Sequence, residues 1–169
     1  MTKLVVNASP LIFLSKINAL SLLAGCFTDI LTPPAVVQEI RHLALPDFIQ
    51  QIPLSPEGMA YVKGAKGRLH AGELETIVLA QEQGITHVAL DDLLARNKAK
   101  QLGLTSIGTA GLLLLAKTKG LIDALTVKIK IHELTHQHGL YLSLSVLKTI
   151  EAKLSEGSPS LHPTPNPAQ

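Results

Sequence analysis

The sequence predicts an α/β protein built on a central parallel sheet. Short apolar runs typical of buried strands alternate with longer stretches of helical periodicity, and most connections between them span only a few residues. Parallel strands need a crossover connection, so this alternation indicates βαβ units. Polar side chains that carry oxygen also follow several apolar runs, and open α/β sheets form their sites at that position.

The expected elements fill the chain up to residue 154. We expect strands at residues 4–6, 29–32, 85–90 and 104–107. We expect helices at residues 10–23, 33–42, 72–83, 93–102, 110–119, 121–138 and 143–154. The predicted N-caps are Ser9, Asp92, Thr109 and Ser143. Pro and Gly residues interrupt every period between residues 44 and 71, so a loop, one extended piece and at most one short helix are expected there.

One domain, residues 1–154, is expected, followed by a disordered tail. The chain has 169 residues, of which 46% are hydrophobic, so it can bury a substantial core. Residues 155–169 are rich in Pro, Ser and Thr and lack the apolar residues that a packed segment needs.

Composition limits the class of protein. Cys26 is the single cysteine, which excludes an intramolecular disulfide and a thiolate metal cage. The longest apolar stretch, residues 110–116, is far shorter than the ~20 residues of a membrane-spanning helix. We therefore expect a cytoplasmic protein with no membrane partner. The net charge of +2 permits nucleic-acid binding without indicating it.

Four side chains that carry oxygen occupy ends of predicted elements: Asn7, Glu39, Glu73 and Asp91. Oxygen ligands from separate elements are typical of a site for a hard cation. Each residue also has a structural interpretation. Asn7 suits a turn before a helix, and Glu39 stands at the edge of an apolar helical stripe, where a surface Glu is common. Glu73 shares the first turn of its helix with Glu75, where the helix dipole favours any carboxylate.

Asp91 and Asp92 follow one strand as an adjacent pair. Adjacent residues that leave a strand point to opposite sides. Asp92 is the natural N-cap of the next helix, which leaves Asp91 for the site, although either residue can be the ligand.

His132, Glu133 and His136 match the HExxH pattern of zinc proteases. A protease of this kind needs a third ligand and a substrate cleft around the motif, and here the motif lies near the chain end. We therefore expect these histidines to be structural or surface residues.

Together these features resemble the PIN-domain superfamily, the fold of VapC-type toxin ribonucleases, and its uncharacterised prokaryotic PIN-like branch in particular. The resemblance covers residues 4–154. The matching segments, in order, are VVNASPLI at 5–12, PAVVQEI at 34–40, GELETIVLA at 72–80, LDDLLAR at 90–96 and GTAG at 108–111.

This resemblance implies a three-layer α/β/α fold with a central parallel sheet of four to five strands. It also implies one or two Mg²⁺ or Mn²⁺ ions held by acidic residues. The implied ligands are Glu39, Glu73 and Asp91 or Asp92, with Asn7 orienting a ligand water. Arg96 and Thr109 are expected to contact RNA, single-stranded or structured.

Two functions follow from the resemblance. The first is a metal-dependent ribonuclease, with an antitoxin protein as a possible partner and a homodimer as the expected assembly. Active PIN nucleases usually carry Asp at the position of Asn7, so one negative charge is missing here. The second function is therefore a degenerate PIN-like module that binds a protein or RNA partner without cleavage.

Overall fold

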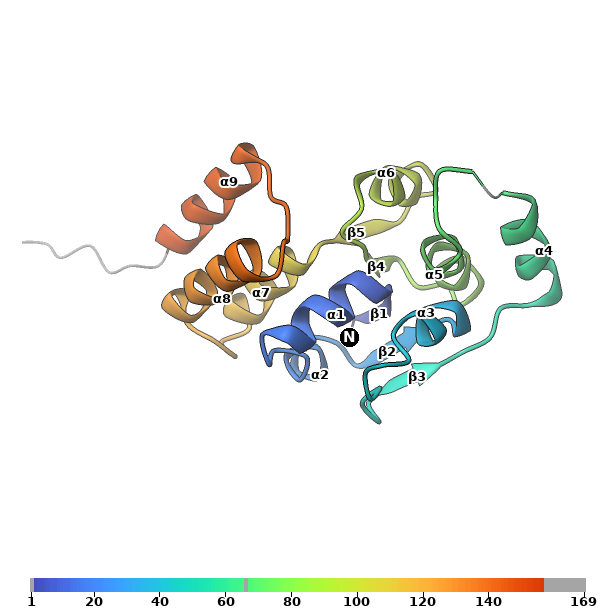
Figure 1. The fold of residues 1–169 in the computed structure, drawn as a ribbon, viewed down its shortest axis with the longest axis horizontal. Helices are drawn as coiled ribbons and strands as arrows, with labels where there is room; N and C mark the ends of the chain where they lie inside the picture. The colour runs from blue at the N-terminus through green and yellow to red at the C-terminus, as the bar shows by residue number, and fades with distance from the viewer. Residues whose placement is uncertain (1, 66, 157–169) are drawn as a thin grey trace, which may run out of the picture.

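In the computed structural model, which describes residues 2–65 and 67–156, five parallel strands form one sheet (Figure 1). The strands are β1 (Lys3–Val6), β2 (Asp29–Thr32), β3 (Ile49–Gln51), β4 (His87–Ala89) and β5 (Thr105–Ile107). Their order across the sheet is β3-β2-β1-β4-β5, and all four pairings are parallel. The expected parallel α/β sheet is confirmed, and its fifth strand comes from the extended piece expected between residues 44 and 71.

Nine helices accompany the sheet in the described part of the chain. They are α1 (Ala8–Lys16), α2 (Leu22–Cys26), α3 (Pro34–Glu39), α4 (Pro56–Gly64), α5 (Ala71–Glu82), α6 (Leu93–Gln101), α7 (Thr109–Thr118), α8 (Ala124–Gln137) and α9 (Leu144–Ser155). None of the helices in residues 2–65 and 67–156 has the length and apolar composition needed to cross a bilayer.

The helices cover both faces of the sheet. Leu4 and Val6 of β1 point to one face, where they join a core made with α1, α2, α7 and α8. Val5 points to the other face and joins a second core made with α4, α5 and α6. Alternate strand residues therefore pack into two separate cores, because successive side chains of a strand point to opposite faces. This is the expected three-layer α/β/α arrangement.

The first long helix of the prediction is wrong. The structure has two helices there, because α1 ends at Lys16 and Asn18 adopts a φ of 52°. Asn tolerates this left-handed conformation better than other non-glycine residues, and it turns the chain before α2 begins. The predicted N-cap is also wrong: Asn7 occupies that position, and Ser9 lies inside the first turn of α1.

Two other helix boundaries differ from prediction. α3 ends at Glu39, three residues before His42. α7 begins at Thr109, with Gly108 as its N-cap. At the start of α7, the side chain of Asp91 accepts the backbone N–H and the hydroxyl of Thr109, the residue that was predicted to be the local cap.

The C-terminal helices agree with the sequence in position. Asp123 accepts a hydrogen bond from the backbone N–H of Thr126 at the start of α8, and Ser143 accepts one from Val146 at the start of α9. α9 ends at Ser155, and residues 157–169 of the predicted tail lie outside the described residues.

The strand order places the candidate site. From β1 the chain moves to β2 and β3 on one side, and then returns to β4 and β5 on the other. The connections therefore diverge between β1 and β4, where their carboxyl ends leave a crevice. Asn7 follows β1 at this point, and its backbone N–H donates to the carbonyl of Ala89 at 3.1 Å.

A carboxylate from α5 fixes the start of α3. Pro33, the N-cap residue, offers no side-chain acceptor. Glu75 is 5% exposed, and its Oε2 accepts the backbone N–H of Ala35 at 3.0 Å. Glu75 thereby supplies the cap that the local sequence lacks, and it ties α3 to α5.

Replacing Glu75 with alanine is expected to destabilise the protein by about 1–3 kcal/mol, since the N–H of Ala35 loses its partner. Glu75→Gln keeps an acceptor oxygen and should cost less. Urea unfolding followed by circular dichroism measures both values. Equal stability of Glu75→Ala and wild type would show that the cap contributes nothing.

Candidate functional site

Asn7 presents a buried oxygen that has no partner. The residue is 5% exposed, and its side chain makes no capping bond to α1. Within residues 2–65 and 67–156, its Oδ1 is the one buried side-chain oxygen or nitrogen without a hydrogen-bond partner. Such an atom is costly unless something outside the protein chain satisfies it. A cation or a water molecule would do so.

Glu39 approaches the same place from α3. Its Oε2 and the Oδ1 of Asn7 lie 3.2 Å and 3.4 Å from the position that a Cβ on Gly72 would occupy. The two oxygens therefore face a common point beside Gly72. A larger residue at 72 would crowd both of them, which gives this glycine a role that sequence reasoning did not identify. Glu39 itself is exposed, so its carboxylate keeps access to solvent.

Glu73 follows Gly72 in the first turn of α5 and is 9% exposed. Its Oε2 accepts the backbone N–H of His70 at 3.0 Å. Burial raises the pKa of this carboxyl, and the nearby carboxylates of Asp92 and Glu39 raise it further, while the His70 hydrogen bond acts in the opposite direction. Glu39, Glu73 and Asp92 are thus close enough to interact electrostatically.

Asp91 is half-buried and accepts three hydrogen bonds. Its Oδ2 accepts from the Ser9 hydroxyl at 2.9 Å and from the Thr109 hydroxyl at 2.7 Å. Its Oδ1 accepts the backbone N–H of Thr109 at 2.7 Å. Asp91 therefore ties the end of β4 to α1 and α7. Ser9 and Thr109, both interpreted as helix caps, bind this carboxylate instead. The ligand role expected of Asp91 stays a prediction.

Asp92 is the N-cap of α6, as predicted. Its Oδ2 accepts the backbone N–H of Ala95 at 2.9 Å. The residue is exposed. Its second oxygen makes no hydrogen bond to the described residues, so Asp92 has more capacity than Asp91 for a ligand.

Arg96 lies beside Asp91. The Nη1 of Arg96 and the Oδ1 of Asp91 stand 3.2 Å and 3.3 Å from the position that a Cβ on Gly108 would occupy. Gly108 thus leaves room for the guanidinium next to the start of α7. Thr109, the other residue expected to contact RNA, is fully buried and serves Asp91. Arg96 is half-buried, so of the two it keeps part of its side chain accessible to solvent.

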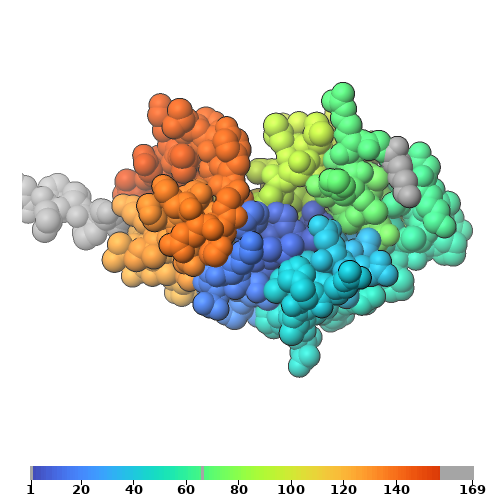
Figure 2. All heavy atoms as spheres, viewed as in Figure 1, coloured from blue at the N-terminus to red at the C-terminus, as the bar shows by residue number. Residues whose placement is uncertain are grey.

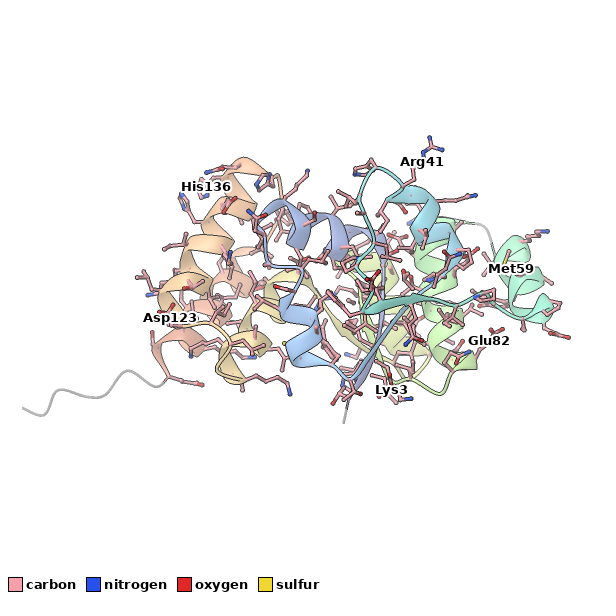
Figure 3. All side chains as sticks on the ribbon, turned by 90° about the horizontal axis from the view of Figure 1, so that it is seen from below. Lys3, Arg41, Met59, Glu82, Asp123 and His136 are labelled. Atoms are coloured by element: carbon pink, nitrogen blue, oxygen red, sulfur yellow. The ribbon has the colours of Figure 1, made fainter. Side chains whose placement is uncertain are left out.

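The HExxH residues lie far from this crevice, on exposed positions of α8 (Figure 3 labels His136). The rings of His132 and His136 stack with centroids 3.9 Å apart. The Nε2 of His138 lies 3.4 Å from the Oε1 of Glu133. The described residues contain no group of three or more His, Cys, Asp or Glu side chains arranged as a preformed ion cage, at this helix or elsewhere. That His132 and His136 are surface residues and not zinc ligands stays a prediction, which zinc analysis of the purified protein would test.

Comparison with known families gives one match, to a family model described as a PIN domain, over residues 3–156. A comparison with curated proteins finds no match.

The raised pKa of Glu73 predicts that Glu73→Gln stabilises the protein when a chelator is present. An acid whose pKa is higher in the folded than in the unfolded state contributes stability at low pH, which is lost as the pH rises through the folded value. The melting temperature of Glu73→Gln should therefore exceed that of wild type at pH 7, by an amount on the order of a few °C.

This gain should fade as the pH falls below about 4, where Glu is protonated in both states. Glu151→Gln, which changes an exposed Glu of α9, is the control and should show no such dependence. A Glu73→Gln protein that melts lower than wild type at pH 7 would contradict the assignment.

Proposed function

The chain belongs to the PIN-domain family, and we propose that it is a ribonuclease that uses Mg²⁺ or Mn²⁺ to hydrolyse RNA phosphodiester bonds. The observation that carries this proposal is the unpartnered Oδ1 of Asn7, which faces the same point as the carboxylate of Glu39. A buried amide oxygen beside a carboxylate is a donor set that suits a hard cation.

Four residues would hold the ion: Asn7 through its amide oxygen, and Glu39, Glu73 and Asp92 through their carboxylates. The mutual repulsion of the three carboxylates, which contributes to the raised pKa of Glu73, is the electrostatic condition that a divalent cation relieves. Asp91 would act on the site indirectly, because its hydrogen bonds to Ser9 and Thr109 hold β4 against α1 and α7.

In a PIN-type reaction, a bound Mg²⁺ or Mn²⁺ supplies an activated water and positive charge beside the phosphoryl oxygens. The residues of this chain would orient the substrate and exclude competing solvent. Arg96 would bind a phosphate next to the cleaved bond as a charge-assisted donor. Gly72 and Gly108 would let backbone and substrate come close to the carboxylates.

The biological setting that we propose is the toxin role in a toxin–antitoxin pair, in the cytoplasm. A small antitoxin protein would then cover the crevice. We also propose a homodimer. Its support is the row of exposed apolar side chains along α8 and the turn before it, Leu121, Leu125 and Ile129, which recur at one-turn spacing.

The alternative is a PIN-like module that binds a partner without cleaving it. Asn7 favours this alternative, because an amide lacks the charge of a carboxylate and so attracts a divalent ion less strongly. The lack of a preformed cage of three His, Cys, Asp or Glu side chains in the described residues favours it as well.

The two functions predict different results for two variants. If the site cleaves RNA, Glu39→Gln should lower Mn²⁺ affinity and cleavage by about tenfold or more, since a charged ligand is lost. Asn7→Asp should raise both, because it adds a fourth carboxylate. Isothermal titration with Mn²⁺ and cleavage of a 5′-labelled single-stranded RNA measure the two quantities.

Glu57→Gln removes an exposed carboxylate from α4 and is the matched control, expected to match wild type. All proteins are purified in the same way, so cleavage that remains in Glu39→Gln at the wild-type level would reveal a contaminating nuclease. If Asn7→Asp leaves metal affinity and cleavage at background, the ribonuclease proposal fails and the binding module replaces it.

A further inference from the structure

A groove extends from the candidate site between α6 and the segment that leads into α9. It has a volume of about 560 Å³ and contains Asp91 at the site and Lys153 of α9. One wall is formed by Leu93 and Arg96 of α6, and the other by Tyr141 and Val146. Figure 2 shows the hollow between the yellow-green lobe of α6 and the orange lobe of α8 and α9.

Large apolar side chains stand open to solvent on both walls. Leu93 is 69% exposed and Tyr141 is 85% exposed. Leu114 and Leu115 of α7 also line the groove and are only partly buried. α1, α2 and α8 cover part of α7, and Leu114 and Leu115 lie on the part that faces the groove. Contiguous exposure of this kind marks a binding surface.

The charged side chains in the groove are mostly basic. Arg96 and Lys153 line it, and Asp91, whose oxygens are engaged with Ser9 and Thr109, is its one acidic residue. The two ion pairs within the described residues involve other side chains, Lys3 with Asp29 and His138 with Glu133. The guanidinium of Arg96 and the ammonium of Lys153 are therefore available to an anionic ligand.

From these features we infer that the groove binds the part of a single-stranded RNA next to the cleaved bond, with a base stacked on Tyr141 and a phosphate bound by Arg96. This inference rests on the proposed ribonuclease function. Base faces are apolar and stack on aromatic rings, while phosphates need cations, so exposed apolar walls with free cations suit a single strand. A volume of about 560 Å³ lies in the range of pockets that hold small ligands, which suits a short piece of a single strand.

The scarcity of aromatic residues allows a direct test. The chain has no Trp and two Tyr, and the second, Tyr61, lies on α4 at the other end of the molecule (Figure 1 shows α4). Tyr61→Phe therefore makes Tyr141 the main source of protein fluorescence, and Tyr141→Phe does the same for Tyr61. The full chain is titrated, in EDTA to prevent cleavage, with a single-stranded RNA of about ten nucleotides.

RNA should strongly quench the fluorescence of Tyr61→Phe, which retains Tyr141. In Tyr141→Phe, the fluorescence should fall only because RNA absorbs the exciting light, an effect that is equal in both variants. Affinity, measured by anisotropy of a labelled RNA, should fall about tenfold in Tyr141→Ala and in Arg96→Ala. Tyr141→Phe should keep most of the affinity, because it retains the ring. Tyr61→Ala is the matched control and should bind RNA as wild type does.

RNA binding by the groove and RNA cleavage at the site can fail separately. If wild type cleaves RNA and Glu39→Gln does not, but Tyr141→Ala binds RNA as tightly as wild type, the inference is overturned and the ribonuclease function stands. The groove would then be left to an apolar protein segment. If wild type neither binds nor cleaves RNA, both are overturned.

Discussion

The carboxylate of Asp91 links three elements that lie far apart along the chain. β4 ends next to it, α1 supplies the Ser9 hydroxyl, and α7 supplies both the hydroxyl and the backbone N–H of Thr109. Hydrogen bonds to a charged acceptor are stronger than neutral ones, and these are partly shielded from water. Asp91 therefore adds hydrogen bonds to the apolar core in which α1 and α2 pack against α7, and it lies where the groove meets the candidate site.

The acidic residues of the candidate site are of two kinds. Asp91 and Glu75 use their charges to hold backbone and hydroxyl groups, so they stabilise the fold without a ligand. Burial raises the pKa of Glu73, and the negative charges of Asp92 and Glu39 add to that rise. Some carboxylates of this chain are therefore satisfied by the fold, whereas Glu73 is ionised there at a cost, which a cation would offset in the function proposed above. The unpartnered oxygen of Asn7 would gain a partner in the same way.

Much of the fold could be predicted because its signals are local. Strand and helix periods predicted the sheet and most helices, and Gly residues past the helix ends marked where several of them stop. The break after α1 could not be predicted in this way, because it depends on one Asn residue whose left-handed conformation carries no periodic signal. Ser9 and Thr109 were misassigned for a similar reason. Their residue types suit helix caps, and only the tertiary fold brings Asp91 within reach of both.

For the site, the sequence indicated which elements contribute, but it could not show which residue of each element is available to a ligand. Position after a strand predicted both Asp91 and Asp92, yet it could not show that Asp91 accepts three hydrogen bonds from distant elements and that Asp92 accepts one from its own helix. Gly72 and Gly108 belong to segments that carried the resemblance, but the space they leave gave no signal in the sequence, and neither did the exposure of Tyr141. Their roles depend on which atoms approach from elsewhere in the chain.

The end of α3 at Glu39 has a further consequence. The last carbonyls of a helix have no partners within it and carry a partial negative charge. Glu39 adds a full negative charge at this end, whereas the opposite end of α3 is already satisfied by Glu75. In the proposed site, a cation beside Glu39 would therefore offset the negative charge of this helix end together with that of the carboxylate.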